Sequence, residues 1–320
     1  MRRFALIGVG GFVAPRHLDS IHRVGGELVA ATDPSDSVGV LDRHFPEARF
    51  FKEIERFDRF LEKLRRGGDA TKIDWISICS PNYLHDAHIR LALRVRANAL
   101  SEKPLVLSPW NLDALALLEE EYERRVFTVL QLRLHPAVIA LRERLEKRLE
   151  AGASEKVHEI DLTYITRRGP WYEVSWKGDE ARSGGVLMNI GVHFFDLLLA
   201  LFGEARSYTL HHREPRKVAG ALELERARVR FFLSIDAVDL SPEVREAGGF
   251  AERRLLIDGD DLDLSAGFTD LHTRVYEETL EGRGHGIEDA RPSIELVHRL
   301  RSAPVDPAAD GRHPKLARAI

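Results

Sequence analysis

The feature that most constrains the fold is a set of closely spaced glycines directly after a short apolar segment at the start of the chain. The apolar residues 4–7 precede Gly8, Gly10 and Gly11, and a segment with helical spacing of its apolar residues follows from Ala14. Glycines let the backbone turn sharply and approach phosphate groups, and the N–H groups at the start of a helix favour negative charge. This order of strand, turn and helix is typical of a dinucleotide-binding Rossmann fold and favours it over an ordinary glycine turn.

Two nearby observations bear on the cofactor. Val13 stands where the usual pattern has its third glycine, whereas a second apolar segment, residues 28–32, ends in Asp33. A carboxylate about 20 residues beyond the glycines is placed to bond the 2′-hydroxyl of the adenosine ribose. A carboxylate there also repels a 2′-phosphate, and no arginine follows it directly. We therefore expect NAD rather than NADP.

The composition is that of a globular protein large enough for two cores. The chain has 320 residues, 44% of them hydrophobic and 31% charged, with a formal net charge of −4. We therefore expect two domains and neither nucleic acid nor a membrane as a partner. Cys79, the single cysteine, lies in an apolar segment, which favours a buried structural thiol over a nucleophile. A reducing compartment, the immediate entry into the fold and the absence of a long apolar run lead us to expect a cytoplasmic location.

Alternating patterns predict a doubly wound parallel sheet over residues 1–131, with residues 132–320 forming a second domain. Strands are predicted over residues 4–7, 28–32, 49–51, 74–79, 98–101 and 126–130, and helices from residue 14 and over residues 38–44, 54–66, 84–95 and 109–125. Ser108 and Pro109 mark the start of the last helix.

Polar residues follow three of these strands at the sheet edge where ligands bind. They lie in residues 80–85, 101–104 and 131–136. Because the three segments meet at one edge, we interpret them as one site rather than as separate polar loops. The expected cofactor site, including the glycine turn, consists of Gly8, Gly10, Gly11, Phe12, Val13, Asp33, Ser80, Pro81, Asn82, His85, Glu102, Lys103 and Gln131.

The second half of the chain is predicted to form a largely antiparallel sheet. A helix over residues 137–150 precedes strands over residues 156–165, 207–212, 219–225, 227–234, 253–258 and 262–264. Asp258 and Gly259 are typical hairpin-turn residues. The tail, residues 303–320, carries no recognisable pattern, and we expect it to be loosely held.

A long loop rich in aromatic and cationic residues follows the first strand of this half. Beyond it, Gly184 and Gly185 precede an apolar helix that Gly203 ends. Asn189 and His193 are four positions apart in this helix, so both point from one face. Taken alone, the histidine would be interpreted as a buried structural residue; the first domain raises the alternative of a functional one.

These motifs resemble the Gfo/Idh/MocA family of nicotinamide-dependent sugar oxidoreductases. The resemblance rests on Gly8-x-Gly10-Gly11, on Ser80-Pro81-Asn82 with His85, on Glu102-Lys103-Pro104, and on Gly184-Gly185 followed by His193-Phe194-Phe195-Asp196. It implies an α/β protein in which a Rossmann domain precedes a C-terminal α/β domain with a large, open-faced, mostly antiparallel sheet.

The resemblance also implies catalytic roles for Lys103, His193 and Asn189. Inositol dehydrogenase-like members of the family carry an aspartate where this chain has Asn189. An asparagine can orient a hydroxyl group but cannot hold a proton, so Lys103 becomes the stronger candidate for the base, with His193 as its partner.

Along most of the chain the likeness is to family members that oxidise the 3-hydroxyl of UDP-N-acetylglucosaminuronic acid with NAD in surface polysaccharide biosynthesis. It implies a homodimer or homotetramer, no metal, and 2-oxoglutarate as a reoxidant in some relatives. The diphosphate and the carboxylate of this substrate require cations and hydrogen-bond donors in its pocket. For Arg228, a place on a salt-bridged face of the sheet is an equal alternative to contact with the substrate. The substrate candidates are Tyr164, Arg167, Arg168, Trp171, Trp176, Lys177, Asn189, His193 and Arg228.

Two other functions stay open. The first is a dehydrogenase of another sugar or cyclitol, against which the cationic aromatic loop argues. The second is a non-catalytic sensor of nucleotides, against which the presence of both Lys103 and His193 argues.

Overall fold

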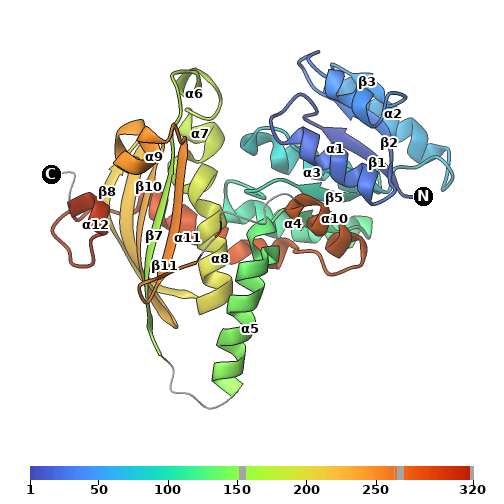
Figure 1. Cartoon of the computed structure of the whole chain (residues 1–320). Helices are drawn as coiled ribbons and strands as arrows, with labels where there is room; N and C mark the ends of the chain where they lie inside the picture. Colours follow the sequence, from blue (N-terminus) through green and yellow to red (C-terminus); the bar gives the residue numbers. More distant parts are fainter. Residues whose placement is uncertain (151–155, 263, 265–269, 318–320) are drawn as a thin grey trace. The chain divides into compact units, whose positions relative to one another are not determined.

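The computed structural model describes residues 1–150, 156–262, 264 and 270–317, and its chain divides into two compact units (Figure 1). Unit 1 comprises residues 1–131 and 270–291, and unit 2 comprises residues 132–269 and 292–320. The boundary expected after residue 131 placed residues 270–291 in the second domain. The structure packs them with unit 1, where Tyr276 is buried with its ring centroid 6.0 Å from that of Phe4.

Unit 1 is built on six parallel strands in the order β3-β2-β1-β4-β5-β6, which confirms the predicted doubly wound sheet. The chain adds strands toward one edge from β1 to β3 and toward the other edge from β4 to β6, so the strand order reverses between β1 and β4. Ligands bind at such a switch point. The strands are β1 (Arg3–Ile7), β2 (Glu27–Thr32), β3 (Arg49–Phe51), β4 (Trp75–Ile78), β5 (Asn98–Ser101) and β6 (Val126–Thr128).

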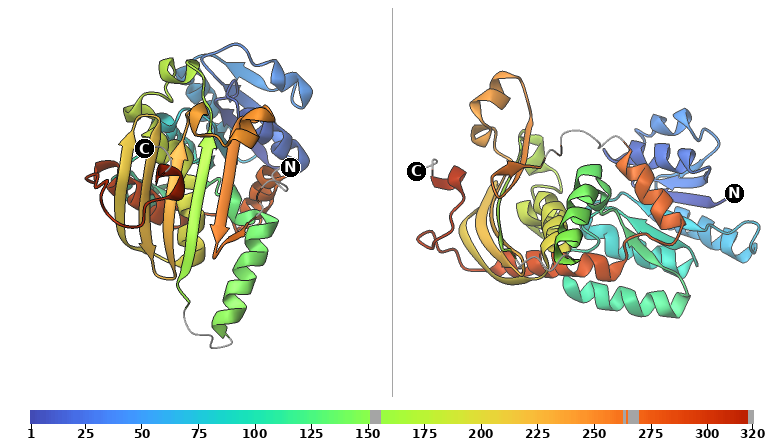
Figure 2. Two further views of the ribbon diagram at one scale, coloured as in Figure 1. Left: turned by 60° about the vertical axis from the view of Figure 1, so that its left-hand side comes forward. Right: turned by 60° about the horizontal axis from the view of Figure 1, so that its bottom comes forward.

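Helices cover both faces of this sheet. α1 packs against α10, and α3 packs against α4 on the opposite face, as right-handed crossovers require (Figure 2). The helices of unit 1 are α1 (Ala14–Arg23), α2 (Ile54–Arg66), α3 (His85–Arg94), α4 (Pro109–Tyr122) and α10 (Leu271–Leu280), with short 3₁₀ helices η1 (Gly39–Arg43) and η2 (Asn82–Leu84). α11 (Ile287–Ser302) begins in unit 1 and ends in unit 2.

Most predicted elements of unit 1 are observed with small shifts at their ends. α2 has the predicted bounds, whereas the helix predicted over residues 38–44 is a 3₁₀ helix. α4 begins after Ser108, as predicted, although the Ser108 side chain makes no capping hydrogen bond. It ends at Tyr122, before the predicted end at residue 125, because Glu123 adopts the left-handed conformation with φ of 52°.

Unit 2 is built on a second six-stranded sheet in the order β12-β11-β7-β10-β9-β8. Among the strands that the structure describes in this sheet, only β7 and β10 pair in parallel, so the prediction of a mostly antiparallel sheet is confirmed. The strands are β7 (His158–Thr166), β8 (Ala205–Glu214), β9 (Lys217–Leu224), β10 (Ala227–Ser234), β11 (Ala251–Ile257) and β12 (Asp260–Asp261).

The prediction of a strand over residues 262–264 is wrong for the part of the chain that the structure describes. Asp258 and Gly259 form the predicted turn with positive φ angles, and β12 starts directly after it and ends at Asp261. The pairing with β11 therefore ends two residues after the turn. Asp263 lies outside the described residues.

One face of the second sheet packs on α8 (Val192–Phe202), where Phe195 and Phe231 meet edge to face at 5.2 Å. A Cβ atom on Gly191 would lie 2.7 Å from the Leu233 side chain, so glycine permits this close approach of helix and sheet. The other helices of unit 2 are α5 (Pro136–Glu150), α6 (Trp171–Val174), α7 (Glu180–Ser183), α9 (Pro242–Glu246) and α12 (Pro314–Ala317), with the π-helix η4 (Leu187–Gly191) and the 3₁₀ helices η3 (Gln131–Leu134) and η5 (Ala237–Asp239).

The helical stretch Glu180–Phe202 corrects one expectation. With a mean hydropathy of 1.8, it is long and apolar enough to cross a membrane by length and composition, whereas no such run was expected. Its apolar character has a local cause, because 78% of its most apolar window is buried inside the protein.

The expectation of a loosely held tail is wrong for residues 303–317. Asp306 N–H donates to the carbonyl of Leu210 at 2.7 Å, and the buried ring of His313 lies 3.2 Å from the Thr163 hydroxyl. Leu316 packs into a cluster with Phe232 and neighbouring core residues. The tail thus covers part of the sheet face opposite α8 (Figure 2). Residues 318–320 lie outside the described part of the chain.

Candidate active site

The glycine turn after β1 packs so closely on neighbouring backbone that it has no room for side chains at two of its positions. Gly8 has a φ of +89°, and a Cβ atom there would lie 2.6 Å from the backbone of Cys79. A Cβ on Gly11 would lie 3.0 Å from the Gly8 carbonyl oxygen. Val13 precedes α1, and no side chain caps the first turn of that helix, which also lacks acidic residues. The turn and the helix start are therefore suited to a diphosphate.

Asp33, directly after β2, contacts the glycine turn through its carboxylate. Its Oδ2 atom accepts the Gly10 N–H at 2.9 Å, and its Oδ1 atom accepts the Ser35 N–H at 2.8 Å. A Cβ on Gly10 would approach the carboxylate to 3.1 Å. Phe12 is 90% exposed, with the Arg16 guanidinium 6.0 Å from its ring centroid. Phe12 is thus the side chain that the turn presents to solvent.

The loop after β4 is fastened to the loop after β5 by His85. The two ring nitrogens of this fully buried residue lie 2.7 Å from the Pro104 carbonyl oxygen and 2.9 Å from the Ser80 carbonyl oxygen. Ser80 also hydrogen-bonds His88 at 2.8 Å, and Asn82 is buried beside it in η2. His85 therefore holds both loops together, and its place in the cofactor site stays a prediction.

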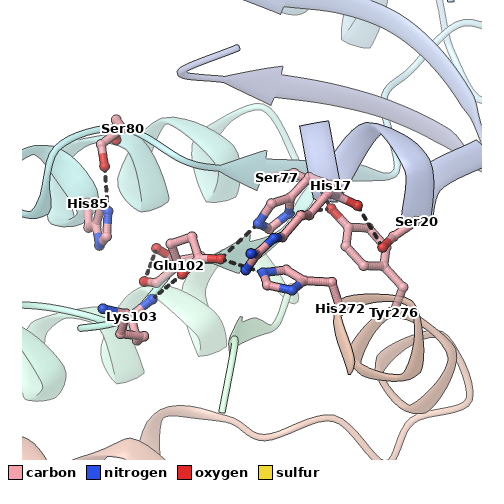
Figure 3. Close-up of polar contacts among 11 residues, drawn as sticks. His17, Ser20, Ser77, Ser80, His85, Glu102, Lys103, His272 and Tyr276 are labelled. Carbon is pink, nitrogen blue, oxygen red and sulfur yellow. Dashed lines mark hydrogen bonds and ion pairs between the residues drawn. The ribbon is translucent and has the colours of Figure 1, made fainter. Parts of the chain in front are cut away.

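Glu102 follows β5 and is also buried. Its carboxylate lies 3.0 Å from Nε2 of His17 on α1 and 3.0 Å from Nε2 of His272 on α10 (Figure 3). Lys103, the next residue, is partly exposed, and its backbone N–H donates to Oε2 of Glu102 at 3.3 Å. Gln131 lies at the start of η3 and is partly buried.

In unit 2, Asn189 and His193 are the partly exposed positions of an otherwise buried segment, residues 186–198. Asn189 lies in the π-helix η4 and its side-chain amide donates to the Tyr172 hydroxyl at 2.9 Å. Single turns of π-helix occur frequently at functional sites. The burial pattern agrees with two side chains pointing from one helix face.

An ion pair fixes the segment after β6 to α8. Arg133 and Asp196 form a two-pronged contact, with N–O distances of 2.7 and 3.0 Å, and the Asp196 side chain is only 3% exposed. Asp196 lies three residues after His193, so the pair holds the turn of α8 that carries this histidine.

In the loop of unit 2 that is rich in aromatic and cationic residues, the cation Lys177 packs against aromatic rings. The Lys177 ammonium lies 4.3 Å from the Trp176 ring centroid and 5.8 Å from that of Trp171. Burial, helped by Arg168, lowers the pKa of Lys177. Arg168 Nε is buried without a hydrogen-bond partner, and Arg167 is exposed.

Tyr164 and Arg228 lie on opposite faces of the second sheet. Tyr164 contacts Phe194 on α8 at 5.1 Å between ring centroids. Arg228 pairs with Glu159 and Glu223 on the face away from α8. These contacts are those of the salt-bridged face considered as the alternative for Arg228.

Sequence reasoning missed His17, His272, Tyr276 and Tyr172 as parts of the site. His17 lies on an ordinary amphipathic helix, and His272 belongs to a segment placed in the second domain. The sequence carries no local signal that joins them. Only the fold brings both histidines to Glu102.

Two family models match the chain. One describes an oxidoreductase family with an NAD-binding Rossmann fold, of the Gfo/Idh/MocA type, and matches residues 2–130. The other describes the C-terminal alpha/beta domain of the same family and matches residues 146–239.

Solved structures resemble the whole chain. The WlbA (WbpB) dehydrogenase from Thermus thermophilus, solved with NAD and alpha-ketoglutarate, is 50% identical, with a TM-score of 0.93 over 98% of this chain and 99% of that chain. The same enzyme solved with NAD and UDP-GlcNAcA gives a TM-score of 0.92. The WlbA dehydrogenase from Bordetella pertussis, at 18% identity and a TM-score of 0.74 over 95% of this chain and 98% of that chain, shares the fold.

Curated relatives match shorter stretches. The uncharacterized oxidoreductase YgjR of Escherichia coli is 27% identical over 213 residues, which cover 65% of this chain and 60% of that protein. D-glucoside 3-dehydrogenase of Escherichia coli is 26% identical over 135 residues, covering 42% and 37% respectively. The chain thus spans less than two thirds of the length of these relatives.

Proposed function

Because the chain belongs to the Gfo/Idh/MocA oxidoreductase family, we propose that it oxidises the 3-hydroxyl of UDP-N-acetylglucosaminuronic acid to a ketone with NAD. One observation carries the substrate: the Thermus thermophilus dehydrogenase, 50% identical over 98% of this chain, was solved with NAD and UDP-GlcNAcA. The activity would belong to the biosynthesis of an acetamido-uronic acid for surface polysaccharide.

The glycine turn suits the diphosphate of NAD, since Gly8 and Gly11 let the backbone turn tightly against the end of β4 and no side chain caps the start of α1. Asp33 would accept the ribose 2′-hydroxyl and would repel the 2′-phosphate of NADP. Phe12, Ser80, Pro81, Asn82 and Gln131 remain our proposed neighbours of the cofactor. Bound NAD would supply the hydride acceptor.

Lys103 and His193 are the proposed acid–base groups. Lys103 would remove the proton of the 3-hydroxyl, and His193 would bond the same hydroxyl or relay its proton. Asn189, which donates to Tyr172, would orient a substrate hydroxyl without exchanging a proton with it. The pair Arg133–Asp196 would keep His193 in place by fixing α8.

The loop of unit 2 would hold the nucleotide and the carboxylate of the substrate. Arg167 is exposed and Arg168 has a buried Nε without a partner, so both are suited to bind phosphate or carboxylate. Trp171, which is 50% exposed, offers a stacking surface. Trp176 would act by holding Lys177, and Tyr164 would line the sugar pocket. We propose no substrate contact for Arg228, because it lies among acidic partners.

The decisive experiment mixes the purified protein with NAD and UDP-N-acetylglucosaminuronic acid and follows NADH. UDP-N-acetylglucosamine lacks the carboxylate, and free N-acetylglucosaminuronic acid lacks the nucleotide, so both should react at least about 10-fold more slowly if both ends are bound. Faster oxidation of a free sugar or of myo-inositol would replace this proposal with the cyclitol alternative. Lack of any hydride transfer with all of these compounds would favour the sensor.

We also propose that 2-oxoglutarate reoxidises the bound NADH. The support is the Thermus thermophilus structure solved with NAD and alpha-ketoglutarate. Addition of 2-oxoglutarate should then abolish net NADH formation and yield 2-hydroxyglutarate together with the ketone. A homodimer or homotetramer is our proposal for the assembly, and light scattering that shows a monomer would refute it.

A further inference from the structure

Glu102 lies at the centre of a buried hydrogen-bond network that joins separate segments of unit 1 (Figure 3). Its Oε1 atom lies 3.0 Å from Nε2 of His17 and 3.0 Å from Nε2 of His272. Nδ1 of His17 lies 2.8 Å from the Tyr276 hydroxyl, which lies 2.6 Å from Oγ of Ser77. α1, β4, the end of β5 and α10 each contribute to this network.

The hydrogens of this network have one consistent arrangement. An ionised carboxylate only accepts hydrogen bonds, so both Nε2 atoms donate to Oε1 of Glu102. Nδ1 of the neutral His17 ring is then an acceptor, and the Tyr276 hydroxyl must donate to it. The Ser77 hydroxyl in turn donates to Tyr276. Each of these contacts has a donor and an acceptor in this arrangement.

The pKa shifts of the network's residues agree with this arrangement of hydrogens. Burial lowers the pKa of His17, which keeps the ring neutral. Burial alone would raise the pKa of Glu102, but the bonds from His17 and His272 outweigh it and hold that pKa well below its usual range. Burial raises the pKa of Tyr276, so its hydroxyl keeps its proton. Glu102 therefore carries a fixed negative charge in this network.

The network reaches Lys103 through the backbone. The second oxygen of Glu102 accepts the Lys103 N–H at 3.3 Å, and the carbonyl of Pro104 lies 2.7 Å from Nδ1 of the buried His85. Lys103 is thus attached between two anchored neighbours. A change in the donors to Glu102 therefore changes how the Lys103 backbone is held.

We propose that His17 and His272 are positioning residues for Lys103: they hold the Glu102 carboxylate, which accepts the Lys103 N–H, so that Lys103 stands at a fixed place next to a fully hydrogen-bonded carboxylate. The proposal rests on the proposed function only in taking Lys103 as the base. His272 is the residue to test, since it lies in residues 270–291, the part of unit 1 that follows residues 132–269 of unit 2 in the sequence.

The same three residues could hold a metal ion, because two imidazoles and a carboxylate offer ligand atoms within 4.8 Å of one another. A metal would have to displace both Nε2 hydrogens, whereas the two N–O distances of 3.0 Å are those of N–H···O bonds. Metal analysis of the purified protein distinguishes the two arrangements. A metal bound at one per chain and lost in His272→Leu would overturn the network.

The matched variants are His272→Leu, which removes the donor, and His272→Gln, whose amide nitrogen keeps an N–H near the position of Nε2. With NAD and the UDP-sugar uronate, we expect His272→Leu to lower kcat about 10- to 100-fold while KM for NAD changes less than about 3-fold. His272→Gln should keep most of the wild-type kcat. Both rates are taken per folded, NAD-binding chain, so a loss of folded protein alone does not lower them.

The pH profile separates positioning from simple support of the fold. The titratable groups facing Glu102 are His17, His272, Tyr276, Cys79 and His85. A carboxylate that has lost one donor attracts a neighbouring ammonium more strongly, so the acid limb of kcat/KM should move to higher pH in His272→Leu and stay in place in His272→Gln. Equal losses in both variants, or an unchanged profile in His272→Leu, would refute the proposal.

A second readout does not depend on the substrate. Acetylation of Lys103 by acetic anhydride, followed by mass spectrometry across a pH series, reports the state of this amine directly. We expect its reactivity curve to move to higher pH in His272→Leu and not in His272→Gln. If the wild-type protein oxidises no UDP-sugar, the proposed function fails, while this labelling still confirms or overturns the role of His272.

Discussion

The Arg133–Asp196 pair offers the sharpest test of how the structure is held near His193. The guanidinium and the carboxylate meet through two N–O contacts of 2.7 and 3.0 Å, and their side chains are 16% and 3% exposed. Removing one partner breaks a buried ion pair, which costs about 3–5 kcal/mol of the free energy of unfolding. Replacing both by apolar residues removes that penalty, and such replacements are often neutral or stabilising by about 1–4 kcal/mol.

A double-mutant cycle measures this coupling. We expect Arg133→Leu and Asp196→Leu each to lower the free energy of unfolding by about 3–5 kcal/mol, and the double variant to lose at most about 2 kcal/mol. Urea unfolding followed by circular dichroism gives these values, provided that the slope with urea concentration stays the same in all four proteins.

The control is a pair with similar geometry and more exposure. Arg230 and Asp161 form contacts of 2.6 and 2.7 Å, with side chains 39% and 18% exposed. Arg230→Leu should cost about 1 kcal/mol or less, since solvent screens the charge left behind. Additive losses for the Arg133 and Asp196 variants, or equal losses at both pairs, would show that burial does not control the energy of this contact.

The remaining predictions concern single residues. Gly8→Ala should weaken NAD binding in calorimetry and lower the free energy of unfolding by about 1–3 kcal/mol, because the new Cβ would lie 2.6 Å from the Cys79 backbone; unchanged binding would contradict this account of the turn. Tyr172→Phe removes a bond to Asn189 and should raise KM for the UDP-sugar while changing stability by about 1 kcal/mol, as substrate kinetics and thermal unfolding would show. Burial lowers the pKa of His313 to about 4, so the unfolded chain binds more protons and the free energy of unfolding should fall by up to about 3 kcal/mol as the pH decreases from about 6.5 to 4; His313→Leu should reduce that slope in urea titrations at several pH values. Leu316→Ala should cost about 2 kcal/mol if the tail packs as described, and a value near zero would mean that it does not.

The first half of the fold could be predicted because its signals are local. The helix over residues 54–66 has the predicted bounds, since its apolar residues recur at helical spacing and glycine follows it. The strand over residues 227–234 was also predicted with its bounds, from the alternation of apolar and arginine residues in its first part. No helix was predicted where the structure has α10 and α11, and α11 contains Pro292, which sequence reasoning takes as a break.

The candidate site also contains residues that local sequence signals predict and residues that they do not. The ends of β1, β2, β4 and β5 could be identified from chain order alone, because parallel strands present their carboxyl ends at one edge. The bonds of His17 and His272 to Glu102 could not, because they join positions that no periodic pattern connects. The tail was misjudged for a related reason: Leu316 and His313 are buried by the sheet they lie on, not by a pattern of their own.

The division of the chain into units has a practical consequence for any fragment. The polypeptide passes from one unit to the other after residue 131, returns at residue 270 and leaves again after residue 291. A protein cut at residue 131 would lack α10 and so expose Phe4 and Ser77, which Tyr276 covers in the whole chain. Anyone who wishes to graft a different second lobe onto this cofactor lobe must therefore carry residues 270–291 along with it.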